Sequence, residues 1–178
     1  MNIESIGKPA FLTDIKYGDF FYAQLGDKVR PCIKAFIVEN DAEVLEYIVS
    51  FTPSEREAGD LPRLFENKTI KGSFAYRVSS PAFRNLVSAG SLLLKTEYWP
   101  KAGIVIESSE ATYLTVKTGR MPHKLMYMNV STGELITSPP KAPFAFITNW
   151  KIVIDQSEVE QVLVSFPSSR ARSPATVL

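Results

Sequence analysis

The feature that most constrains this fold is a succession of short runs rich in Val, Ile, Phe, Tyr and Thr, separated by Gly, Pro, Asn, Asp and Ser. β-branched and aromatic residues are enriched in strands, and the intervening residue types end strands and form turns. Several runs alternate apolar and polar positions, as half-exposed strands do. The pattern predicts a mainly β domain, of the β-rich α+β class, with a barrel-like or sandwich antiparallel sheet.

Two connections between the expected strands carry turn signals. Gly26-Asp27 separates the first two runs and predicts a hairpin, and Ser131-Thr132-Gly133 predicts a bulged hairpin whose glycine adopts the left-handed conformation. The expected strands cover residues 19–25, 30–38, 43–51, 73–78, 92–98, 103–107, 111–117, 124–130, 134–137 and 144–150, with 151–154 extending the last run or forming another. The charged, Gly-containing stretch between them at 54–62 is expected to be a loop.

Two segments carry helix signals. The segment 80–90 begins with Ser80 and Pro81, which suit a helix N-cap and first turn, and it ends on a glycine. The segment 157–166 starts with capping-box spacing and places its apolar residues at helical intervals. A short helix is therefore expected in each, with a strand over 159–166 as the alternative.

Length and composition bound the domain organisation. The 178 residues exceed a typical domain of about 100–150 residues but fall short of two. Hydrophobic residues make up 45% and charged residues 22% of the chain, so burial can offset chain entropy. We expect one β-rich domain over residues 1–167 and a flexible tail over 168–178, which offers little apolar surface.

The charge balance and the cysteine content limit the cellular location and the partners that we expect for this chain. The 20 Lys and Arg residues balance 19 Asp and Glu residues, so no global field draws the chain to nucleic acid or an anionic membrane. Cys32 is the only cysteine and is expected to be buried, and no secretory leader is recognisable, so a cytoplasmic location is expected. No apolar run approaches the roughly 20 residues that span a bilayer, so no membrane partner is expected.

Recognisable catalytic motifs are missing from the sequence. One cysteine and one histidine cannot supply the three or four ligands of a zinc site. The chain contains no phosphate-binding loop, no dinucleotide-binding glycine motif and no nucleophile elbow around a serine. We therefore expect neither a metal nor a cofactor, name no catalytic residue and favour a noncatalytic interpretation.

A local basic segment is the clearest exception to the charge balance. Residues 111–133 contain no Asp or Glu, and Tyr113 and Tyr127 flank the basic positions. The candidate nucleic-acid or anion-binding residues of the segment are Lys117, Arg120, His123 and Lys124. Aromatic rings beside cations can stack bases while the cations meet phosphates, and His123 could move protons. A solvated hairpin tip is the alternative interpretation.

Arg30 is a further candidate for binding nucleic acid. Gly18-Asp19 before one strand and Arg30-Pro31 at the start of the next resemble the opening of the PemK-like toxin barrels, a family that includes ribonucleases with small SH3-like barrels. The resemblance is confined to this hairpin. It implies that Arg30 contacts RNA or supports a transition state, whereas a surface ion pair would explain the same arginine without RNA.

Three functions fit this sequence. The leading hypothesis is a noncatalytic binding domain that contacts another macromolecule, preferably a protein, through strand edges or an aromatic anchor. Trp99, which precedes Pro100, is the proposed anchor, and burial in the core is its alternative. The other hypotheses are a nucleic-acid-binding protein or small-barrel ribonuclease that uses Arg30 or the loop 117–124, and a small-ligand-binding barrel.

Overall fold

The computed structural model describes residues 7–39, 43–53, 60–70, 74–85, 102–118, 125–141, 144–156 and 159–166. Nearly all of these residues lie in or between strands. The strands are β1 (Gly7–Phe11), β2 (Phe20–Leu25), β3 (Lys28–Glu39), β4 (Glu43–Pro53), β5 (Asp60–Glu66), β6 (Phe74–Val78), β7 (Ala82–Asn85), β8 (Val105–Ser108), β9 (Thr112–Thr118), β10 (Leu125–Asn129), β11 (Leu135–Ile136), β12 (Phe144–Ile147), β13 (Trp150–Gln156) and β14 (Val159–Phe166), and the 3₁₀ helices are η2 (Leu12–Asp14) and η3 (Asn67–Thr69). The prediction of a mainly β chain is confirmed.

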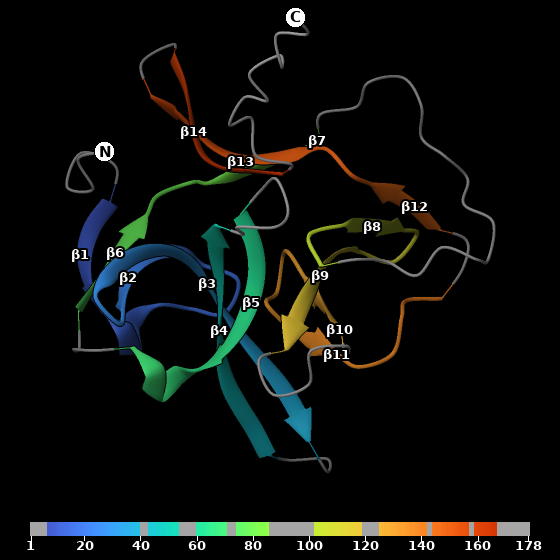
Figure 1. Cartoon of the computed structure of the whole chain (residues 1–178), viewed down its shortest axis with the longest axis horizontal. Helices are drawn as coiled ribbons and strands as arrows, with labels where there is room; N and C mark the ends of the chain where they lie inside the picture. The colour runs from blue at the N-terminus through green and yellow to red at the C-terminus, as the bar shows by residue number, and fades with distance from the viewer. Residues whose placement is uncertain are drawn as a thin grey trace, which may run out of the picture.

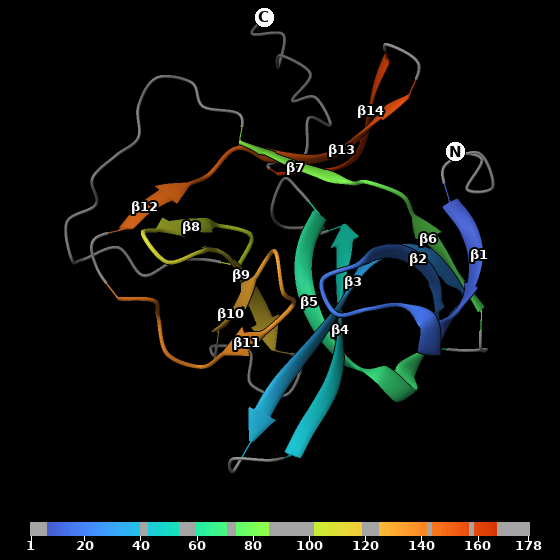
Figure 2. The same cartoon turned by 180° about the vertical axis from the view of Figure 1, so that it is seen from behind.

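The strands form two sheets (Figures 1 and 2). The larger sheet has the order β1-β6-β2-β3-β4-β5-β9-β10-β11, and β8 joins it by pairing with β9 and β12. The smaller sheet has the order β14-β13-β7. The sheets are not closed, and their arrangement is sandwich-like rather than a complete barrel.

Both predicted hairpins are present. In the first, Leu25 pairs with Lys28 around Gly26-Asp27, which joins β2 to β3. In the second, Gly133 has a φ of +77° at the turn between β10 and β11. These turns formed as expected because glycine adopts a positive φ without steric cost.

The larger sheet curls back toward its own middle strands at two points. An isolated antiparallel bridge joins Leu25 of β2 to Ile70, and an isolated parallel bridge joins Phe36 of β3 to Glu134. A small apolar cluster that includes Phe21 and Cys32 fills the first curl. The thiol of Cys32 is fully buried there, as expected, and burial raises its pKa to about 12.

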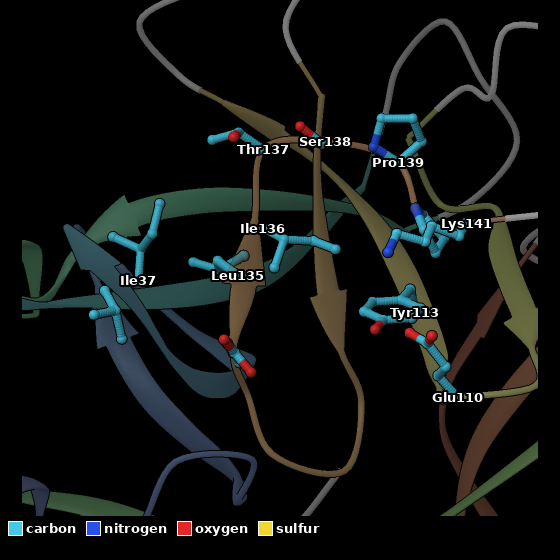
Figure 3. A pocket seen from close by; sticks show the side chains of 12 residues that line it. Ile37, Glu110, Tyr113, Leu135, Ile136, Thr137, Ser138, Pro139 and Lys141 are labelled. Atoms are coloured by element: carbon cyan, nitrogen blue, oxygen red, sulfur yellow. The ribbon is translucent and has the colours of Figure 1, made fainter. Parts of the chain in front are cut away.

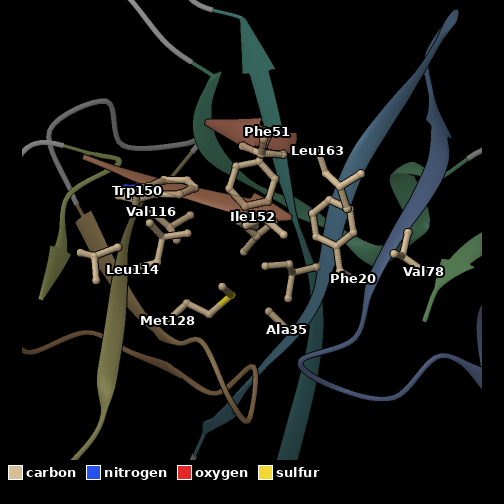
Figure 4. Packing of buried hydrophobic residues seen from close by; sticks show 14 of the residues in the cluster. Phe20, Ala35, Phe51, Val78, Leu114, Val116, Met128, Trp150, Ile152 and Leu163 are labelled. Carbon is tan, nitrogen blue, oxygen red and sulfur yellow. The ribbon is translucent and has the colours of Figure 1, made fainter. Parts of the chain in front are cut away.

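The main core lies between the larger sheet and β13–β14. Figure 4 shows Phe20 and Phe51 of the larger sheet facing Trp150 and Ile152 of β13, with Leu114, Val116 and Met128 completing the cluster. Trp150 is fully buried and stacks against Phe83 and Phe166, with ring centroids 5.1 and 5.8 Å away. This aromatic stack fixes β13 against its two neighbours.

Both helix predictions are wrong where the structure describes the chain. In 80–90, Ser80 has a φ of +52° and β7 follows at Ala82–Asn85, because pairing with the distant strand β13 outweighs the local capping signals. In 157–166, the alternative is correct, since β14 pairs along the length of β13. A register shift opposite Ile152/Val153 lets the consecutive Leu163 and Val164 both be buried, whereas Val162, which belongs to the helix-like spacing, is exposed.

Besides β7, two further strands were not predicted. β1 lies in a segment with little strand character, and β5 begins inside the stretch 54–62 that was expected to be a loop. The predicted strand 92–98 and the predicted tail 168–178 lie outside the described residues. Among the helices that the structure describes, none has the length and apolar character needed to cross a membrane.

Candidate functional site

The structure places two of the sequence-predicted site residues and leaves the others untested. Arg30 lies on β3 opposite Ala23, and Lys117 lies near the end of β9 opposite Leu125 and Arg63. The remaining candidates, Trp99, Arg120, His123 and Lys124, lie outside the described residues.

Strand register puts Arg30 and Lys117 on one face of the larger sheet. Lys117 is opposite Arg63, Arg63 is opposite Ser50, and Ser50 is opposite Cys32. Directly opposed residues share a face, and so do residues two apart on one strand. Arg30 is two residues from Cys32, so all three cations project from the same face, and sequence reasoning missed Arg63.

This face carries little compensating negative charge. On β3, β4, β5, β9 and β10, the strand registers place one carboxylate on it, that of Glu46. Glu46 is already engaged, since Lys34 Nζ lies 3.3 Å from its Oε1, and Tyr17 and Asn67 donate hydrogen bonds of 2.8 and 2.7 Å to it. Within the described ranges, Arg63 and Lys117 have no ion-pair partner.

The cluster around Glu46 is best explained by stability. Burial would raise the pKa of Glu46, but the hydrogen bond from Tyr17 and the charge of Lys34 outweigh it and lower that pKa. Lys34 is only 6% exposed, so its ammonium needs this partner, and it also lies 5.2 Å from the centre of the Tyr17 ring. The cluster fastens the chain before β2 to the middle of β3 and β4.

A second feature is an open groove of about 410 Å³ beside β11. Its lining includes Ile37 and Val38 of β3, Leu135 and Ile136 of β11, and the segment 137–141. Figure 3 shows Ile37, Leu135 and Ile136 among the side chains around it. Tyr113, Glu110 and Glu134 complete the lining. The volume falls within the range of small-ligand pockets, about 300–1,000 Å³, so the small-ligand hypothesis stays a prediction.

The backbone of β3 presents an unpaired edge to this groove. The amide of Phe36 donates a hydrogen bond of 3.0 Å to Gly133 O, so Phe36 directs its polar backbone groups away from β4. Alternate residues of an antiparallel ladder point the same way, which directs the amide and carbonyl of Val38 toward the groove. In the part of the chain that the structure describes, no backbone group pairs with them.

The groove combines apolar side chains with a predominantly acidic rim. The side chain of Val38 is half exposed, as is that of Val44 directly opposite on β4. Glu110 and Glu134 are exposed at the rim, against the single cation Lys141. Sequence analysis anticipated binding through a strand edge but did not locate it, because the edge arises where β3 extends past its pairing with β2.

The comparisons with known proteins assign the chain to no family. Within the described residues, no group of three or more His, Cys, Asp and Glu side chains is placed to hold a metal ion. No protein-family model matches the chain, the PemK-like toxin family included, and neither does any curated protein or solved structure.

Proposed function

We propose that this protein is a noncatalytic binding domain that accepts an extended segment of another protein along the free edge of β3. The observation that carries the proposal is the backbone of Val38, which pairs with no backbone group among the described residues and faces a groove lined by apolar side chains. Sheet edges of this kind bind peptides by adding a strand, with backbone hydrogen bonds giving affinity and side-chain pockets giving specificity.

The arrangement of β3 and β11 supports this mode of binding. The two strands meet at the single parallel bridge between Phe36 and Glu134, and the groove begins beyond that bridge. Leu135 and Thr137 alternate with Ile136, which is opposite Tyr127 of β10, so their polar backbone groups point away from β10. An extended segment therefore finds hydrogen-bonding groups on both walls.

The side chains indicate the chemistry of the partner. Ile37, Val38 and Ile136 offer apolar contacts, whereas Glu110 and Glu134 place negative charge at the rim. A segment that alternates apolar residues with Lys or Arg would match both features, because successive side chains of a strand point to opposite faces. We therefore assign the groove to a basic, extended polypeptide.

Selection from a displayed library of random peptides of about ten residues, the length of a long strand, tests this function. Peptides that alternate apolar and basic residues should be enriched by the unmodified protein. Val38→Pro should abolish their binding, because proline removes the free amide but no bond of the β3–β4 ladder. The matched variant Val38→Thr keeps the amide and the branched shape, and it should retain binding.

The stability of the two variants serves as a control, and both should show cooperative unfolding in urea. Failure of the unmodified protein to enrich any peptide would overturn the proposal. Equal binding of the enriched peptides by the folded Val38→Pro and Val38→Thr variants would also overturn it, since the edge of β3 would then not be the contact.

A further inference from the structure

A pair of like charges lies directly opposed on two neighbouring strands of the larger sheet. Arg63 of β5 and Lys117 of β9 are partners in a parallel ladder, where directly opposite cations repel each other. Arg63 is exposed and Lys117 is partly exposed, so both side chains can reach solvent. Folding therefore brings two positive charges together without a neutralising partner among the described residues.

The rest of this face reinforces the imbalance. Arg30 lies two strands from Arg63 and two residues further along, and the positions between them, Cys32 and Ser50, are buried in the curl of the sheet. The carboxylate of Asp19 is held by Arg77, 3.0 Å away, as that of Glu46 is by Lys34. Because the whole chain has a net charge of +1, this concentration of cations does not follow from a basic composition.

We infer that Arg63, Lys117 and Arg30 form a binding site for the phosphate backbone of a single-stranded nucleic acid. Arg63 and Lys117 would share one phosphate, since an arginine fork and a lysine ammonium both donate to phosphate oxygens. Arg30 would meet another phosphate further along the strand. Three cations that reach solvent suit a flexible single strand, whereas a tightly bound duplex requires more phosphate contacts.

This site is separate from the groove of the proposed function. Arg30 and Val38 are eight residues apart on β3, about 26 Å along an extended strand. On β9, Lys117 is four residues, about 13 Å, from Tyr113 of the groove lining, and neither Lys117 nor Arg63 lines the groove. Loss of nucleic-acid binding and loss of peptide binding can be distinguished by testing each variant with both probes.

Fluorescence anisotropy with a labelled oligouridine of about 12 nucleotides, within the usual footprint of single-strand-binding domains, tests the inference. The unmodified protein should bind at about 50 mM salt and lose affinity as salt rises. The double variant Arg63→Gln/Lys117→Gln should bind at least about tenfold more weakly. Its affinity should also fall less steeply as salt rises, by the equivalent of one or two phosphate contacts. Arg30→Gln should give a smaller loss.

The matched control is Lys16→Gln/Lys68→Gln, which removes the same total charge from exposed positions on other elements. It should bind the oligonucleotide nearly as well as the unmodified protein. The melting temperature of Arg63→Gln/Lys117→Gln should be unchanged or higher, because the substitution relieves repulsion, so any loss of binding is not a loss of folding.

Three results would overturn the inference. The first is no binding of oligouridine at low salt, and the second is an equal loss of affinity in the control variant. The third is complete displacement of the oligonucleotide by inorganic phosphate at low millimolar concentration, which would identify a site for the free anion instead.

Discussion

The indole nitrogen of Trp150 donates a hydrogen bond of 2.7 Å to the carbonyl oxygen of Gly103, and the bond is buried. It ties β13 of the smaller sheet to the residues that lead into β8 of the larger one. The carbonyl of Gly103 has lost access to water, so the bond and the aromatic stack around Trp150 act together to hold the two sheets in place.

Trp150→Phe should therefore destabilise the fold although it keeps an aromatic ring at this position. The substitution leaves the buried carbonyl of Gly103 without its donor, at a cost of about 1–3 kcal/mol, and removes part of the stack. Urea unfolding measures the difference, and the exposed Val162→Thr on β14 serves as a control with little effect. Equal stabilities for the Phe variant and the unmodified protein would contradict the assignment.

Gly103 should tolerate no side chain, because of both its backbone conformation and its close contact with the Phe166 ring. Its φ is +89°, and a Cβ added there would lie 2.6 Å from the Phe166 ring. Gly26 has a φ of +69° with open space around it, so Gly26→Ala should cost about 1 kcal/mol, the backbone penalty alone. Gly103→Ala should cost clearly more in thermal unfolding, and Phe166→Leu should recover part of the excess. Equal costs at the two glycines would rule out the clash.

The pH dependence of stability should include a contribution from Glu46. Its pKa is lowered in the folded state, so its stabilisation is present above the pKa of the unfolded chain, about 4.3, and is lost as pH falls through the folded value. Glu46→Gln should cost about 1–2 kcal/mol near neutral pH, a figure discounted for the partial exposure of the carboxylate. Urea unfolding from pH 7 to pH 3 should show the gap between variant and unmodified protein closing. A constant gap would show that the carboxylate charge contributes nothing.

The thiol of Cys32 should be inert in the native protein. It is fully buried and its pKa is raised to about 12, so almost no thiolate exists near neutral pH. Labelling with an aromatic disulfide reagent at about pH 8, below the ordinary thiol pKa of 8.5, should be slow in the folded state and rapid in concentrated urea. Rapid labelling of the folded protein would contradict the burial of Cys32.

The local signals in the sequence were sufficient for most strands. Alternation across 73–78 and the glycines at 26 and 133 act within a few residues, so the strand β6 and both hairpins could be predicted. The helix expected over 157–166 was wrong because pairing with β13 outweighs an apolar spacing that mimics a helix. β5 was missed because its charged residues face solvent between strands that only the fold brings beside it.

Less of the candidate site could be predicted from the sequence, because it depends on which strands lie side by side. Lys117 and Arg30 were named from local charge and from a short resemblance, but Arg63 becomes relevant only through its parallel pairing with Lys117. The free edge at Val38 likewise depends on where the bridge between Phe36 and Glu134 stops. Both surfaces are set by pairing between strands that are distant in the chain, which composition and periodicity do not encode.

The most direct test of the proposed function is hydrogen exchange at the backbone amide of Val38, measured by NMR with and without a selected peptide. In the free protein this amide should exchange rapidly, because it donates no hydrogen bond to the described residues. Saturation with the peptide should slow its exchange by more than about tenfold, as expected when a strand is added. Unchanged exchange at Val38 under saturating peptide would contradict the account.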